Sequence, residues 1–297
     1  MSVGKGQNMQ IGCHGSVWTG QFDTAGVQLA IAKTAEAGFD LIEIPLMDPD
    51  QADLTAVRRA LSSSGLAVTA SLGLSEHTDV SSDDPDVVAA GENLLNRCLE
   101  ALSEIGGTHL VGVIYTAMRK YMTPATALNR KHSIEAISRL ADRAAELGIR
   151  MGVEVVNRYE SNLLNTSRQA VAYVEETGSN NLMVHLDTYH MNIEEPDMFT
   201  PVLTAGSRLG YVHIGESHRG YLGSGTVDFD SFFRALATVE YDGPIVFESF
   251  SSAIVHPDLS NMLGIWRNLW TDGEDLGRHA NSFIRNQLAT VSSIQMH

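Results

Sequence analysis

The sequence predicts an α/β protein that folds as a single-domain (β/α)8 barrel of the TIM type. Short apolar runs alternate with longer amphipathic segments along the 297 residues, roughly eight times, and this alternation is typical of parallel strands joined by helices. The spacing of the runs stays even through both halves of the chain, and no linker rich in proline, glycine and serine divides it. About eight strand and helix units in a chain of this length indicate a closed barrel.

The apolar runs are short, as expected for buried strands of a parallel sheet. The predicted strands lie near 9–14, 40–46, 66–72, 109–114, 151–156, 182–187, 209–214 and 244–248. Residues 1–8 are polar and contain glycine. We therefore expect a flexible leader over 1–8 and one barrel domain, with a C-terminal helical extension, over 9–297.

Helices are predicted between the strands from the three- and four-residue spacing of apolar side chains. They lie near 24–37, 51–63, 86–105, 125–147, 167–177, 197–205, 229–239 and 258–271. The chain after Trp270 forms either a further helix under the barrel or a contact between subunits. A doubly wound open sheet is the alternative fold, but no Gly-x-Gly-x-x-Gly turn follows the first predicted strand.

Composition excludes several classes of function. Hydrophobic residues make up 43% and charged residues 19%, which is an ordinary globular balance. The formal net charge of −16 disfavours binding to nucleic acid or to an anionic membrane surface, and no apolar run is long enough to span a bilayer. Cys13 and Cys98 are the only cysteines, so a disulfide framework is not expected and a reducing cytoplasmic location fits.

Ionisable residues end four consecutive predicted strands, namely Glu154, Asp187, His213 and Glu248. In a barrel of this type, side chains at the C-terminal strand ends point into the active site. Burying three carboxylates and one imidazole together is costly unless a cation neutralises them. The pattern therefore predicts a divalent metal site, with Mn2+ favoured and Co2+ or Mg2+ as alternatives. Separate structural roles for the four side chains remain the competing interpretation.

The predicted positions of Glu154 and Glu248 suggest a reaction. They are three strands apart around the barrel, so they can approach a small substrate from opposite sides. A metal between them would acidify the C–H bond next to a ketone, and a carboxylate could then remove that proton. One glutamate removing the proton and the other returning it would invert the carbon without a nucleotide cofactor.

Three segments resemble the D-tagatose 3-epimerase family, which includes the D-allulose (D-psicose) and L-ribulose 3-epimerases among the xylose-isomerase-like TIM barrels. They are Val-Glu-Val-Val-Asn-Arg-Tyr-Glu (153–160), His-Leu-Asp-Thr-Tyr-His-Met-Asn (185–192) and the run from His213 to Phe229. Phe247-Glu248-Ser249-Phe250 resembles the family as well, and the likeness covers nearly all of the predicted barrel. Val155 and Val156 depart from it, because many relatives have a proline there.

The resemblance implies that Glu154, Asp187, His213 and Glu248 hold the metal and that the two glutamates exchange the C3 proton. It also implies that Glu160, His190 and Arg219 hold the O1–O3 end of the substrate. We expect Trp18 in the first loop, and Tyr115 and Met118 in the fourth, to contact the sugar tail. A hydrophobic lid is the alternative role for these last three side chains.

The sequence thus predicts a ketose 3-epimerase that acts on free keto-sugars such as D-fructose and D-allulose, D-tagatose and D-sorbose, or L-ribulose and L-xylulose. An aldose–ketose isomerase of the same fold and a non-catalytic sugar-binding barrel are the alternatives. A homo-oligomer, either dimer or tetramer, is expected because relatives associate. We also expect an outward helix face formed by Trp266, Trp270 and the apolar stretch 263–270.

Overall fold

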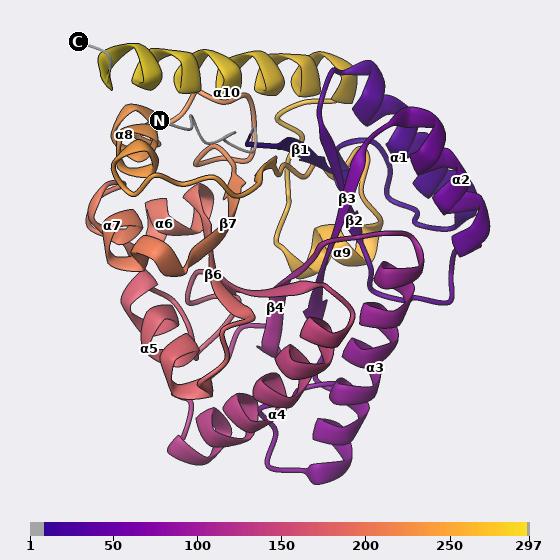
Figure 1. The fold of residues 1–297 in the computed structure, drawn as a ribbon, viewed down its shortest axis with the longest axis vertical. Helices are drawn as coiled ribbons and strands as arrows, with labels where there is room; N and C mark the ends of the chain where they lie inside the picture. The colour runs from indigo at the N-terminus through magenta and orange to yellow at the C-terminus, as the bar shows by residue number, and fades with distance from the viewer. Residues whose placement is uncertain (1–8, 296–297) are drawn as a thin grey trace, which may run out of the picture.

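The computed structural model describes residues 9–295, so the predicted leader over 1–8 lies outside the described residues. Eight parallel strands form a closed barrel in which each strand pairs with its neighbours in chain order (Figure 1). The strands are β1 (Ile11–His14), β2 (Leu41–Pro45), β3 (Ala67–Leu74), β4 (His109–Ala117), β5 (Arg150–Val155), β6 (Leu182–Asp187), β7 (Leu209–Ile214) and β8 (Ile245–Phe247). The first strand closes the ring against the last, with Ile11 opposite Ile245 and Cys13 opposite Phe247. The predicted barrel is confirmed.

Helices surround the barrel and connect its strands (Figure 1). They are α1 (Thr24–Glu36), α2 (Leu54–Ser64), α3 (Pro85–Glu104), α4 (Ala127–Glu146), α5 (Ser167–Thr177), α6 (Thr188–Glu194), α7 (Thr200–Ala205), α8 (Phe229–Thr238), α9 (Pro257–Met262) and α10 (Gly273–Gln295), with short 3-10 turns at Gly15–Val17 and Gly206–Arg208. Aspartate or threonine side chains accept a hydrogen bond from the first turn at Asp23, Asp53, Asp84, Thr126, Thr166 and Asp228. These caps explain why the helices begin where they do. None of the described helices has the length and apolar character needed to cross a membrane.

The prediction of one helix over 258–271 was wrong. The chain forms the short helix α9, and Gly264 then adopts a left-handed backbone with φ of +67°. The segment that follows is irregular until α10 begins at Gly273. Trp270 is buried and its indole N–H donates to Ser249 Oγ at 2.8 Å, whereas Trp266 is 77% exposed. The outward helix face proposed for 263–270 is therefore absent.

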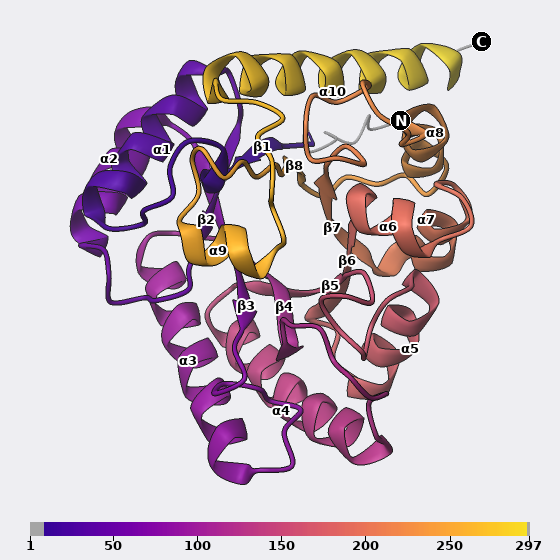
Figure 2. The same cartoon turned by 180° about the vertical axis from the view of Figure 1, so that it is seen from behind.

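The last helix, α10, packs along one side of the barrel and contacts α8, β1 and β8 (Figure 1). Its buried residues include Leu276, Ala280 and Ile284, which recur at four-residue steps along one face. Viewed from behind, α9 lies in front of β2 and close to β3, at one side of the ring of strands (Figure 2). Leu259 of α9 lines the same cavity as Glu154 and Glu248, so this helix lies beside the C-terminal ends of the strands.

Two layers of side chains fill the inside of the barrel. Near the N-terminal strand ends lies a compact apolar layer made by Leu41, Val111, Met183, Tyr211 and Val246. A larger hydrophobic core packs between the outer surface of the strands and the helices. Buried ionisable residues occupy the other end of the barrel interior, at the C-terminal ends of the strands. The apolar layer separates the buried ionisable residues from the N-terminal end of the barrel. In barrels of this type, active sites lie at the C-terminal ends of the strands.

Candidate active site

The structure brings the four predicted strand-end residues together. Glu154 near the end of β5, Asp187 at the end of β6, His213 in β7 and Glu248 just after β8 are all buried, and their candidate ligand atoms lie within 4.8 Å of one another. His213 Nδ1 is 3.4 Å from Glu154 Oε1 and 3.5 Å from Glu248 Oε1. Strands three positions apart in the ring thus direct two carboxylates at one imidazole nitrogen.

The same residues fit a divalent cation. His213 Nδ1 is buried without a hydrogen-bond partner, although it faces the two glutamates. Such an atom would cost free energy unless it binds something, and a metal ion satisfies it. Three carboxylates with one imidazole are a donor set suited to a hard or borderline divalent ion. The structure therefore contains a candidate metal centre.

Three further buried residues extend the cluster, and the sequence predictions missed them. Glu43 and His14 form a second group with Glu248, and His185 forms a third with Glu154 and His213. Both ring nitrogens of His185 lack a hydrogen-bond partner. A signal was present in the sequence, because His14 ends the first strand and Glu43 interrupts the apolar run Leu-Ile-Glu-Ile.

The environments of the paired glutamates differ. Burial raises the pKa of Glu154 to about 8, and burial likewise raises the pKa of Asp187 to about 6. Burial also acts on Glu248, but His213 and Arg219 outweigh it and hold the pKa of Glu248 below its usual value. Two carboxylates whose pKa values are pushed apart are typical of acid and base pairs in active sites.

Arg219, His190 and Glu160 surround the candidate metal centre. Arg219 Nη1 donates to Glu248 Oε2 at 2.7 Å and to Asp187 Oδ2 at 3.2 Å. The guanidinium lies 3.9 Å from the centre of the Tyr189 ring, which fixes its plane. Arg219 also adopts a left-handed backbone with φ of +60°, which is uncommon outside glycine and is found at functional sites.

His190 has a defined tautomer. Its Nδ1 accepts a hydrogen bond from the Asn157 backbone N–H at 3.1 Å, so Nε2 carries the proton. That Nε2 lies 3.8 Å from Glu154 Oε1 and 3.6 Å from Asp187 Oδ2. The Asn157 side chain in turn donates to Glu160 Oε1 at 2.8 Å. The loop after β5 therefore orients both His190 and Glu160 beside the candidate metal centre.

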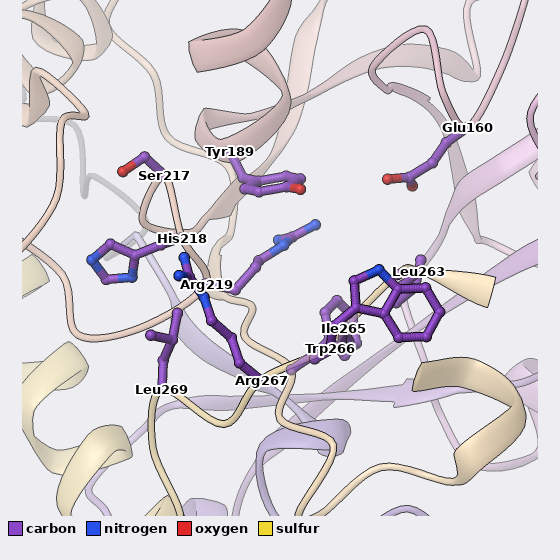
Figure 3. A pocket seen from close by; sticks show the side chains of 12 residues that line it. Glu160, Tyr189, Ser217, His218, Arg219, Leu263, Ile265, Trp266, Arg267 and Leu269 are labelled. Atoms are coloured by element: carbon purple, nitrogen blue, oxygen red, sulfur yellow. The ribbon is translucent and has the colours of Figure 1, made fainter. Parts of the chain in front are cut away.

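A cavity lies over the carboxylates, and Met118, Glu160 and Arg219 line it together with Leu259 and Leu263 from the α9 region. An outer pocket adjoins this cavity and shares Glu160 and Arg219 with it. Figure 3 shows Glu160, Tyr189 and Arg219 on one side of the outer pocket and Trp266 across from them. The cavity and the outer pocket therefore lie next to each other, and the cavity is the one lined by Glu154, His213 and Glu248 of the candidate metal centre.

Trp18 and Tyr115, which were expected at the sugar tail, do not line the cavity. The Trp18 indole N–H donates to Thr34 Oγ1 at 2.8 Å, on α1. Tyr115 lies within β4, not in the loop after it, and its hydroxyl donates to the Glu154 carbonyl at 2.9 Å while its ring packs near Tyr173. Both side chains pack between the barrel and its helices, and the expected position of Tyr115 in the fourth loop is corrected to a position within β4.

Comparison with known proteins identifies the family. A model of the xylose isomerase-like TIM barrel matches residues 31–278. The chain belongs to this family. Within the xylose isomerase-like barrels, its relatives include the ketose 3-epimerase of Arthrobacter globiformis, which is 62% identical over 289 residues, covering 97% of this chain and 100% of that protein.

Solved structures from the xylose isomerase-like barrels agree with this grouping. A crystal structure of D-allulose 3-epimerase from a Methylomonas species in complex with D-allulose has a TM-score of 0.93 and 53% identity, over 94% of this chain and 97% of that one. A structure of L-ribulose 3-epimerase has a TM-score of 0.94 and 40% identity, over 97% of both chains. The chain groups with the ketose 3-epimerases of the family, so it is an enzyme of the isomerase class.

Proposed function

We propose that the protein inverts C3 of free ketoses through an enediolate, interconverting pairs such as D-fructose and D-allulose, D-tagatose and D-sorbose, or L-ribulose and L-xylulose. The observation that carries the proposal is the convergence of Glu154 and Glu248, from β5 and β8, on His213 Nδ1 at 3.4 and 3.5 Å. The similarity to named ketose 3-epimerases supports the same substrate class.

We propose that Glu154, Asp187, His213 and Glu248 hold a divalent metal, with Mn2+ preferred over Co2+ and Mg2+. When bound, the ion would act as a Lewis acid that polarises the C2 carbonyl and the 3-hydroxyl and so acidifies the C3–H bond. The unpartnered Nδ1 of His213 supports this assignment, because a buried nitrogen facing two carboxylates needs a partner.

The two glutamates would act on opposite faces of C3. One carboxylate removes the C3 proton, and the C3–H electron pair forms the C2–C3 double bond of the enediolate while the carbonyl oxygen gains the negative charge. The other glutamate, in its acid form, returns a proton to the opposite face and the carbonyl is restored. No electrons leave the substrate, and the roles reverse for the epimer. Without metal, burial raises the pKa of Glu154, whereas His213 and Arg219 hold the pKa of Glu248 below its usual value, so the two carboxylates lie in different electrostatic environments.

The surrounding residues would bind the O1–O3 end of the ketose. The Nε2–H of His190 points toward Glu154 and Asp187, where it can donate to a substrate oxygen. Arg219 lines the cavity and carries a positive charge that can stabilise a developing enediolate. Glu160 also lines the cavity, and Met118 provides an apolar contact for the sugar tail.

We further propose that the protein works in the cytoplasm as a dimer or tetramer of identical chains. Cys13 and Cys98 are free and buried, which fits a reducing compartment. Trp266 is 77% exposed beside the outer pocket, and a large exposed aromatic side chain is typical of an interface. Sedimentation velocity at micromolar concentration tests the assembly, and a single monomer peak would contradict it.

The proposed reaction is tested with metal-free protein to which Mn2+ is restored. D-Fructose, D-allulose, D-tagatose and L-ribulose are each incubated with the enzyme in deuterated water, and products are identified by chromatography and mass. We expect the C3 epimer of each accepted substrate with deuterium at C3, and no turnover before Mn2+ is added. An aldose product would favour the aldose–ketose isomerase instead. Binding without turnover would favour the non-catalytic sugar-binding barrel, and full turnover without metal would refute the metal role.

A further inference from the structure

Glu43 contacts the side of His213 that faces away from the paired glutamates. It lies in the middle of β2 and is fully buried, and its carboxylate oxygens are 2.9 and 3.0 Å from His213 Nε2. A carboxylate accepts hydrogen bonds, so Nε2 carries a proton. The other ring nitrogen, Nδ1, is the one that faces Glu154 and Glu248 and has no hydrogen-bond partner.

We propose that Glu43 is a positioning residue for the metal, because its hydrogen bond holds His213 in the tautomer and orientation that leave the Nδ1 lone pair for the ion. A histidine that binds metal through one nitrogen is commonly oriented by an acceptor on the other, and that acceptor also strengthens the histidine as a ligand. This inference rests on the proposed metal role of His213. It adds a residue from β2 that lies outside the four proposed ligands.

The Glu43 carboxylate is itself fixed in place. Tyr211 donates its hydroxyl hydrogen to Glu43 Oε2 at 2.6 Å, and Thr69 Oγ1 lies 2.7 Å from the Tyr211 oxygen. Because Tyr211 already donates to the carboxylate, its oxygen accepts from Thr69. The Tyr211 ring belongs to the apolar layer below, so the packing of that layer holds the chain Thr69–Tyr211–Glu43–His213. The metal-facing nitrogen is thereby oriented by side chains from β2, β3 and β7.

Glu43 could instead bind a second metal together with His14 and Glu248, since the three offer ligand atoms within reach of one another. The tautomer of His14 opposes this. Its Nδ1 accepts from the Ser16 backbone N–H at 3.2 Å, so the Nε2 that faces Glu43 carries a proton and has no lone pair for an ion. The geometry favours a positioning role for Glu43 over a second site.

The test compares Mn2+ binding to metal-free wild type and Glu43→Gln by isothermal titration calorimetry. The glutamine keeps the size of the side chain but removes the charge, and we expect Mn2+ affinity to fall about 10- to 100-fold. The d–d absorption spectrum of the Co2+-loaded variant should also differ from wild type, because it reports on how His213 binds. Near-UV circular dichroism of the metal-free proteins checks that both are folded.

Tyr241→Phe is the matched control. It removes a buried hydrogen bond of 2.7 Å to the Pro244 carbonyl, just before β8 and outside the ionisable cluster. We expect it to lower stability without changing Mn2+ affinity or the Co2+ spectrum. A fall in affinity for this variant equal to that of Glu43→Gln would overturn the inference, because general destabilisation would then explain both.

Wild-type Mn2+ affinity in a folded Glu43→Gln variant would overturn the positioning role while leaving the proposed function intact. Failure of the wild-type protein to bind Mn2+ would instead overturn the proposed function. If Glu43→Gln does not fold, Mn2+ binding is measured with Glu43→Asp instead. It keeps the negative charge but is shorter by one methylene, so weaker Mn2+ binding supports the role and unchanged binding refutes it.

Discussion

The inside of the barrel holds two layers that differ in chemistry although the same strands carry them. The lower layer, near the N-terminal strand ends, is made of Leu41, Val111, Met183, Tyr211 and Val246. The upper layer, near the C-terminal ends, gathers Glu43, Glu154, Asp187, His213 and Glu248 with the neighbouring histidines. The lower layer stabilises the fold by burying apolar surface. The upper layer buries carboxylates, which costs stability unless they are neutralised.

Strand β7 shows how the layers are joined. Tyr211 and His213 are two residues apart, so both side chains point into the barrel, one in each layer. The Tyr211 ring packs in the apolar layer and its hydroxyl donates to Glu43 in the layer above. The apolar layer is thus also the support on which the ionisable side chains are oriented. Substitutions in the lower layer that leave the Tyr211 hydroxyl in place should mainly lower stability, whereas substitutions in the upper layer should mainly lower activity.

The largest expected effect comes from the upper layer. Glu154→Gln and Glu248→Gln keep the size of each side chain but remove the base, so turnover should fall at least about 10²-fold. Steady-state kinetics measure the loss, and metal content is determined for each variant to separate lost catalysis from lost binding. A variant with one face disabled should still exchange the C3 hydrogen of one epimer with deuterated water. A variant that holds metal and epimerises at nearly the wild-type rate would disprove the paired-glutamate mechanism.

The lower layer should show the opposite behaviour. Leu41 is fully buried there, and Leu41→Ala leaves a cavity that should lower the free energy of unfolding by about 2–5 kcal/mol. Urea denaturation measures the loss. The kcat of the folded fraction, assayed well below the melting temperature, should stay within about twofold of wild type. A large loss of kcat with little loss of stability would break the proposed division between the layers.

Metal should stabilise the upper layer. If the ion binds only the folded protein, the free energy of unfolding should rise by about 2.7 kcal/mol when free Mn2+ is 100 times its dissociation constant. Thermal unfolding of metal-free protein with increasing Mn2+ tests this expectation. The Leu41→Ala variant should show a similar increment, because its cavity lies in the other layer. An unchanged melting temperature for wild type would argue against a specific metal site.

The smallest effect is expected outside both layers. Trp18→Phe removes the 2.8 Å hydrogen bond to Thr34, so it should cost about 1 kcal/mol of stability. Its ratio of kcat/KM values for D-fructose and L-ribulose should equal that of wild type. Met118→Ala is the matched comparison, because Met118 lines the cavity and its loss should change that ratio. If the ratio of kcat/KM values changed for Trp18→Phe but not for Met118→Ala, Trp18 would be the residue that contacts the sugar.

The sequence predicted the barrel because strand and helix periodicities are local, and it predicted the four strand-end residues because each ends an apolar run. The sequence did not reveal the role of Glu43, because this residue lies in the middle of an apolar strand and not at its end. Its partner His213 is also far away in sequence. The absence of Trp18 and Tyr115 from the cavity lining has a related reason. Proximity to a strand end does not say whether a side chain faces the cavity or the surrounding helices.

The segment 263–270 illustrates another limit. Its apolar residues suggested a helix, but a left-handed Gly264 and the hydrogen bond of Trp270 to Ser249 favour an irregular path. Whether an indole is buried or exposed depends on a contact formed only in the folded barrel. The sequence holds no local signal for such a contact.

The pairing of β1 with β8 determines when the site first exists during synthesis. A ribosome-bound chain that ends before β8 already contains Glu154, Asp187 and His213, but it lacks Glu248 and leaves two strand edges unpaired. The complete set of donor atoms forms only when the last strand joins the first. If the four side chains hold a divalent ion, a chain that ends before β8 would lack one of the donors and should bind that ion less tightly than the full chain.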